Sequence, residues 1–119
     1  MIALHGCTST REYRAAIASE DVEARIRGIK MAADNRDYGA VPLIVDRLED
    51  EDDGVRFYAI LALERITGER FGYDYARISR DRAAAVQKWR LYIKRGEHLS
   101  AAERPESGSD REDAENPGA

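Results

Sequence analysis

Few residues of this chain have the type and spacing that chemistry requires. Cys7 is the single cysteine, and the two histidines, His5 and His98, lie outside the patterned central region. One cysteine forms neither an intramolecular disulfide nor a CxxC metal site. Nucleophilic catalysis would have to combine Cys7 with one of these flanking histidines. We therefore expect no catalytic site, no metal site and no cofactor.

The sequence LHGC at residues 4–7 is similar to the end of a bacterial lipoprotein signal, where a cysteine after a small residue is lipidated. A working signal also needs a basic start and a longer apolar stretch than residues 2–4 provide. Two interpretations stay open. Residues 1–9 are a frayed segment with a free cysteine in a cytoplasmic protein, or the natural start lies upstream and Cys7 anchors the protein to a membrane.

The acidic run at residues 49–54 invites comparison with a calcium-binding loop. In an EF-hand the sixth position is glycine and the twelfth is a bidentate glutamate. Counting from Glu49 makes Gly54 sixth but Ile60 twelfth, inside an apolar run. The run is instead expected to be a turn that caps the next helix and pairs with Arg56.

Hydrophobic periodicity and end signals predict five helices, over residues 10–18, 22–33, 41–48, 54–67 and 80–95. Ser9 and Glu12 form a capping-box pattern, Pro42 suits a first helical turn, and Gly68 is a stop signal. The continuous apolar sequence FYAILAL, residues 57–63, predicts a helix that is buried nearly all round.

An internal repeat with an offset of 31 residues relates the second and fourth predicted helices. It places Arg25 over Arg56, and it pairs small or branched residues at the positions where helices touch, such as Gly28 over Ala59. A weaker third echo places Tyr58 over Trp89. Repeat units stack because one unit cannot bury its apolar face alone.

The stretch VPLIVDRLEDEDDGVRFYAILALERITG resembles a HEAT repeat of the short bacterial kind, and EARIRGIKMAADN resembles the second helix of the preceding repeat. The resemblance implies an all-α fold, a small α-solenoid of stacked antiparallel helix pairs over residues 10–95. An aromatic loop, with Phe71, Tyr73 and Tyr75, and a helix bearing Trp89 would close the stack. Trp89, Tyr92 and Tyr58 are expected in the core, with a small-molecule pocket as the other interpretation.

Residues 96–119 have seven acidic side chains, two arginines and one large aliphatic residue. Such a composition predicts a disordered acidic tail. The remaining 95 residues carry 16 acidic and 17 basic side chains, so no strong field of one sign favours nucleic acid or an anionic membrane.

Five basic residues are candidates for partner binding: Arg25, Arg56, Arg82, Lys88 and Arg90. Arg25 and Arg56 either offer a ladder of guanidinium groups to an acidic partner or phosphate, or form salt bridges with the acidic turn of the neighbouring repeat. The basic residues of the last helix form either a solvated face or a contact surface for the tail, a nucleic-acid backbone or lipid headgroups.

These features predict a non-catalytic protein–protein interaction scaffold or adaptor. Its partner would be another protein, through the exposed side of the second helices and through the basic last helix. The alternative is a HEAT-like domain that contacts a nucleic-acid backbone with its arginines, and strong salt dependence would distinguish it.

Overall fold

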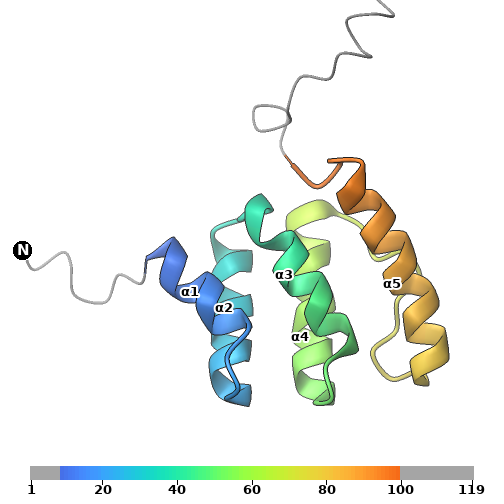
Figure 1. Cartoon of the computed structure of the whole chain (residues 1–119), viewed down its shortest axis with the longest axis horizontal. Coiled ribbons are helices and arrows are strands. Elements are labelled where there is room, and N and C mark those ends of the chain that lie inside the picture. Colours follow the sequence, from blue (N-terminus) through green and yellow to red (C-terminus); the bar gives the residue numbers. More distant parts are fainter. Residues whose placement is uncertain (1–8, 100–119) are drawn as a thin grey trace, which may run out of the picture.

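The computed structural model describes residues 9–99, and within this range every regular element is a helix (Figure 1). The α-helices are α1 (Thr10–Ile17), α2 (Val22–Asp34), α3 (Val41–Asp46), α4 (Asp53–Thr67) and α5 (Ser79–Lys94). Two short 3₁₀ segments, η2 (Tyr38–Ala40) and η3 (Arg47–Glu49), flank α3. The all-α prediction is confirmed, and the predicted ends of α1, α2, α4 and α5 lie within one residue of the observed ones.

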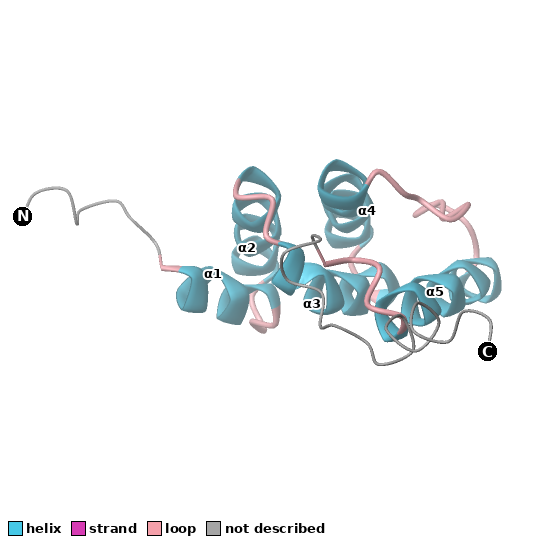
Figure 2. Ribbon diagram, turned by 90° about the horizontal axis from the view of Figure 1, so that it is seen from above, coloured by secondary structure: helices cyan, strands magenta, loops and turns pink. Residues whose placement is uncertain are grey.

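The helices form two layers (Figure 2). One layer holds α1, α3 and α5, and the other holds α2 and α4. Because α1 packs on α2, α3 packs on α4 and α2 packs on α4, two antiparallel pairs stack side by side. This is the predicted small α-solenoid.

The third unit of the stack is built differently from the first two. Residues 68–78 form a loop that crosses from one end of the stack to the other, so α5 runs in the same direction as α4 (Figure 1). However, α5 packs against α3 and η3 in the first layer. The third sequence echo, which aligned α5 with α2 and α4, therefore matches the direction of α5 but not its layer.

Helix ends follow the predicted local signals. The Ser9 hydroxyl accepts from the amide of Glu12, and the Glu12 carboxylate accepts from the amide of Ser9. The carboxylates of Asp21 and Asp52 cap α2 and α4 in the same way, each accepting from an amide of the first turn at 2.9 Å. Gly68 ends α4 with a φ of 83°, a conformation that favours glycine.

The segment predicted as one helix over residues 41–48 is instead divided. It begins as α3, with Pro42 in the first turn as expected, and tightens to the 3₁₀ segment η3 after Asp46. Such tightening is common at the end of an α-helix. It turns the chain toward the acidic segment that precedes α4.

The prediction that α4 is buried nearly all round is wrong for one side of the helix. Ile60 and Leu63 are fully buried, whereas Phe57 is 36% and Leu61 is 41% exposed. No helix of the described chain stands beside α4 on the flank away from α2, and the loop at residues 68–78 covers only part of that flank.

The aromatic loop and α5 pack on the end of the stack, as predicted, but they leave part of α4 uncovered. Trp89 is fully buried, and the ring of Phe71 packs edge-on against it with centroids 4.8 Å apart. The ring of Tyr75 packs against Phe57 at 5.1 Å. The Tyr73 hydroxyl donates to the backbone carbonyl of Leu48, which ties the loop to η3.

Tyr73 makes the stability of the closing unit sensitive to alkaline pH. Burial raises the pKa of its phenol to about 12. Because the pKa is raised above the ordinary value near 10, Tyr73 contributes stability below about pH 10, and this contribution is lost as the pH rises toward 12.

We expect Tyr73→Phe to lower the free energy of unfolding by about 1 kcal/mol at neutral pH, because the Leu48 carbonyl loses its donor. The variant should also lose less stability than the wild type between pH 8 and about pH 11. Urea denaturation at both pH values, followed by circular dichroism, measures the difference. Parallel losses in the two proteins would contradict a role for this phenol.

Beyond α5 the chain stays ordered for longer than predicted. Gly96, with a φ of 73°, ends the helix, and its amide donates to the carbonyl of Ile93. His98, which the sequence placed in the acidic tail, is buried. Residues 100–119 and Cys7 lie outside the described residues, so the predictions about the tail and lipidation stay predictions.

Candidate interaction surfaces

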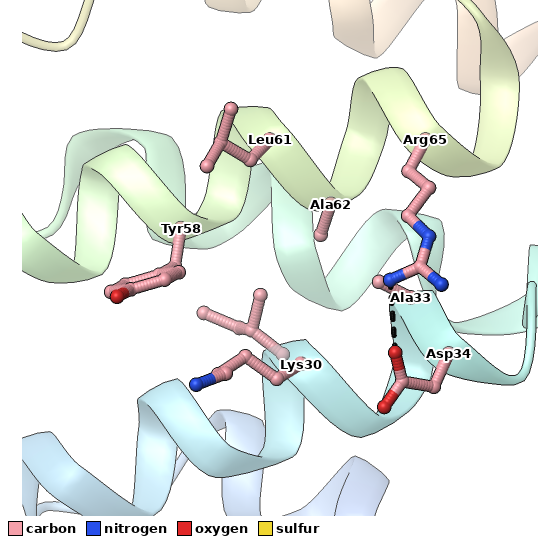
Figure 3. A pocket seen from close by; sticks show the side chains of 8 residues that line it. Lys30, Ala33, Asp34, Tyr58, Leu61, Ala62 and Arg65 are labelled. Atoms are coloured by element: carbon pink, nitrogen blue, oxygen red, sulfur yellow. Dashed lines mark hydrogen bonds and ion pairs between the residues drawn. The ribbon is translucent and has the colours of Figure 1, made fainter.

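A groove with a mainly apolar lining lies between the parallel helices α2 and α4 (Figure 3). It has a volume of about 350 Å³. We call it the α2–α4 groove, and it is lined by Ile29, Lys30, Ala33, Asp34, Tyr58, Leu61, Ala62 and Arg65. Leu61, which is 41% exposed, leaves apolar surface open to solvent between Tyr58 and Arg65, whereas Ala62 is buried.

Charged and aromatic side chains mark the two ends of the groove. At one end the Lys30 ammonium lies 5.3 Å from the centroid of the Tyr58 ring, a cation–π distance. At the other end Arg65 pairs with Asp34 at 2.9 Å, as the dashed line in Figure 3 shows. Arg36 also donates to the Arg65 carbonyl at 2.8 Å. The groove therefore has an apolar centre and polar ends.

Arg25, a candidate for partner binding, is engaged inside the fold. Its Nε lies 3.0 Å from one carboxylate oxygen of Asp50, and a terminal nitrogen donates to the other oxygen at 3.2 Å. The same guanidinium donates to the Ser19 carbonyl at 2.8 Å. Arg47 completes the cluster, 3.1 Å from Asp50. The contact joins α2 to the acidic turn of the next repeat. Of the two alternatives for Arg25, this is the salt bridge within the fold and not the contact with a partner.

Arg56, at the equivalent position of the second repeat, binds backbone and not carboxylates. Its guanidinium donates to the carbonyls of Asp50 at 2.8 Å, Glu51 at 3.2 Å and Tyr75 at 3.2 Å. The predicted pairing of Arg56 with the acidic turn is thus found, but through carbonyl oxygens. The two equivalent arginines each hold the segment between consecutive helices of the stack.

The three candidates on α5 differ in how they are used. Arg82 is partly buried and donates to the carbonyl of Arg77. Arg90 bridges to Asp46 at 3.1 Å and to Glu49 at 3.8 Å. Lys88 is exposed and forms no ion pair within residues 9–99. Of the basic candidates, Lys88 is the one whose charge the described fold does not use.

Comparison with known proteins decides the family. A family model of HEAT repeats matches residues 12–87, which is more than half of the chain. The chain belongs to the HEAT-repeat family. Neither the curated proteins nor the solved structures contain a match to it.

In HEAT-repeat terms, the matched region spans both helix pairs, the aromatic loop and the first half of α5. The described part of this HEAT-repeat chain contains no helix long and apolar enough to cross a membrane. Nor does that part bring three or more His, Cys, Asp or Glu side chains together as a metal site would require.

The three aromatic residues considered as a pocket are not gathered in one place. Trp89 and Tyr92 pack against each other near the Phe71 ring, with centroids 5.5 Å apart, whereas Tyr58 lines the α2–α4 groove. Trp89 is core, as expected, whereas Tyr58 and Tyr92 are only partly buried against the core.

The groove residues were not predicted individually, although the repeat carried a signal for them. The offset of 31 residues relates Lys30 to Leu61 and Asp34 to Arg65. Equivalent positions on neighbouring HEAT helices face the same side of a solenoid, so these pairs lie next to each other across the groove. Exposed residues that are 31 positions apart therefore carry a signal for this surface.

Proposed function

We propose that this chain is a non-catalytic HEAT-repeat scaffold that binds a segment of another protein in the α2–α4 groove. The observation that carries the proposal is the exposed apolar surface of Leu61 at the centre of a hollow whose ends are polar. HEAT-repeat units commonly serve as protein-interaction scaffolds, and their stacked helices create extended binding surfaces.

The chemistry of the groove suits a peptide segment. Apolar side chains at its centre would supply the hydrophobic contribution to affinity, and polar groups at its rim would orient the partner. The pair of Arg65 and Asp34 is half-exposed or more, so its contribution to fold stability is small and both groups are available to a partner. A segment with an apolar residue near Leu61 and polar residues on either side fits this arrangement.

The contacts of Arg25 and Arg56 favour a protein partner over a nucleic-acid backbone. Binding of phosphates requires cations that face solvent, and the guanidinium groups of both arginines are already hydrogen-bonded within the stack. A measurement of DNA binding at low and physiological salt tests the alternative, which predicts a steep loss of affinity with salt.

A photo-crosslinking amino acid at position 61 tests the groove directly. We expect Leu61→p-benzoylphenylalanine to form a covalent adduct with one protein in native lysate, because this side chain lies at the centre of the groove. The yield of the adduct should fall when Lys30→Glu and Arg65→Glu are added, because these residues flank the site. Mass spectrometry of the purified adduct identifies the partner and the segment that it contributes.

The matched control places the same crosslinker at Ala15, which is exposed on α1. Adducts formed equally from positions 15 and 61, or an adduct at 61 that is insensitive to the flanking substitutions, would contradict binding in the groove. Circular dichroism of each variant confirms that the helical fold is retained.

A further inference from the structure

The outer face of α5 carries a second surface, on the opposite side of this helix from its core. Lys88, Leu91 and Arg95 follow one another at spacings of three and four residues, so their side chains lie on one helical face. Leu91 is 46% exposed, and Lys88 and Arg95 are exposed as well. A single exposed leucine is common on soluble proteins, so its surroundings decide whether it has a role.

Two features set this leucine apart. First, it borders a cavity of about 210 Å³ whose other walls are Phe71, Lys88, Tyr92, Arg95 and Glu97. Second, Lys88 and Arg95 flank it, and neither forms an ion pair within residues 9–99. We call Lys88, Leu91 and Arg95, together with the cavity, the α5 surface.

The aromatic walls of the cavity pack against the core. The ring of Phe71 lies 5.2 Å from that of Tyr92 and 4.8 Å from that of Trp89, which is fully buried. The aromatic walls are therefore anchored to the core, and binding would cost little side-chain ordering on this side. The cavity is smaller than the 300–1,000 Å³ that is usual for small-molecule sites, and its size suits one apolar side chain.

The charges specify what kind of segment would carry that side chain. Two cations that form no ion pair with the described residues flank the apolar contact, one turn away on either side, and Glu97 is the acidic residue among those that line the cavity. Carboxylates placed before and after the apolar residue of a ligand would meet Lys88 and Arg95. Exposed ion pairs contribute little by themselves, so the apolar side chain is needed for affinity.

We propose that the α5 surface binds an acidic segment of a partner protein, which inserts an apolar side chain beside Leu91. This site lies on a different helix from the α2–α4 groove, and it would allow the scaffold to hold two segments at once. Its failure would leave the proposal for the groove intact, since no residue is shared between the two surfaces.

Fluorescence anisotropy with synthetic peptides tests the proposal on the full chain. The probe is a short labelled peptide with a Leu-Phe pair flanked on both sides by glutamates. We expect saturable binding in the micromolar range at physiological salt. We also expect about tenfold weaker binding by Lys88→Gln/Arg95→Gln and about fivefold weaker binding by Leu91→Ala. All three residues are exposed, so the fold should be unaffected, and circular dichroism checks this.

Arg77→Gln/Arg80→Gln is the matched control, because it removes two exposed positive charges, one from the loop just before α5 and one from the first turn of this helix. Its affinity for the probe should equal that of the wild type. Equal weakening by the two double variants, or equal binding of a peptide in which serines replace the Leu-Phe pair, would reduce the interaction to unspecific charge attraction and overturn the proposal. Absence of saturable binding would overturn it as well.

Two other occupants are distinguished by the same assay. A peptide of residues 100–119 is acidic and lacks a large apolar residue. If this peptide competes with the labelled probe as strongly as the unlabelled probe peptide does, the surface binds the chain's own C-terminal segment and not a partner. Light scattering that shows a dimer, dissociated by Leu91→Ala, would assign the surface to a second copy; a monomer with specific probe binding supports the proposal.

Discussion

Asp50→Asn is expected to lower the free energy of unfolding by about 3 kcal/mol. The Asp50 carboxylate is almost completely buried, with 4% of its side chain exposed, and it faces Arg25 and Arg47 at 3.0 and 3.1 Å. It also accepts from the amide of Asp52 at 3.0 Å, which shapes the turn before α4. The substitution keeps the shape of the side chain but leaves two guanidinium groups without a counter-charge where solvent compensates poorly.

The matched control is Asp34→Asn. Asp34 also pairs with an arginine of the neighbouring repeat, at 2.9 Å from Arg65, but 67% of its side chain is exposed. Surface ion pairs contribute about 0–1 kcal/mol, so this variant should unfold at nearly the same urea concentration as the wild type. Urea denaturation followed by circular dichroism measures both. Equal effects of the two substitutions would show that burial of the Asp50 cluster is not what stabilises the stack.

Gly28→Ala is expected to lower the free energy of unfolding by about 2 kcal/mol, although alanine is the better helix former. A methyl group at this position would lie 2.7 Å from the Tyr13 carbonyl oxygen and 2.9 Å from the Ile17 amide nitrogen. Both are backbone atoms of α1, so the clash is relieved only if the whole helix moves away from α2. The loss from separating these helices exceeds the gain in helix propensity.

Gly54→Ala provides the comparison within α4. The atoms nearest to its added methyl group belong to side chains, the Asp52 carboxylate at 3.0 Å and the Ile26 methyl at 4.0 Å. A side-chain end can shift by the few tenths of an ångström required, so the expected change is below about 1 kcal/mol. The melting temperatures of the two variants measure the contrast. A Gly28→Ala variant as stable as the wild type would contradict the close approach of α1 and α2.

Both predictions concern contacts between separate elements of the stack. Features that depend only on neighbours along the chain were easier to predict. Helix ends were predictable because capping depends on residues within one turn, as at Ser9 and Glu12. Gly28 was expected to lie at a helix contact because the repeat paired it with Ala59, and the approach to α1 bears this out.

Predictions failed where the burial or the position of a helix depended on which segment packs beside it in space. The apolar run in α4 gives no indication that a loop, and not a helix, follows it in the second layer, and so Phe57 was expected to be buried. The pattern of α5 could not reveal its layer either, because it shows an apolar face but not which helices pack against that face. Both outcomes follow from the path of residues 68–78.

The candidate surfaces show the same division. The sequence alone indicated three positively charged residues as contact residues. Arg25 and Arg56 occupy equivalent positions of the repeat, and Lys88 lies on α5. The three-dimensional arrangement engages the first two in the stack and leaves Lys88 exposed beside Leu91.

By itself, then, the sequence determined the helices, their caps, the repeat of 31 residues and the family, because these depend on periodicity and on neighbours along the chain. Only the tertiary structure decided which faces stay open and which charges are free to meet a partner. Burial and ion pairing are set by whatever packs against a residue in space, and the packing partners of α4 and α5 come from segments that local patterns do not relate.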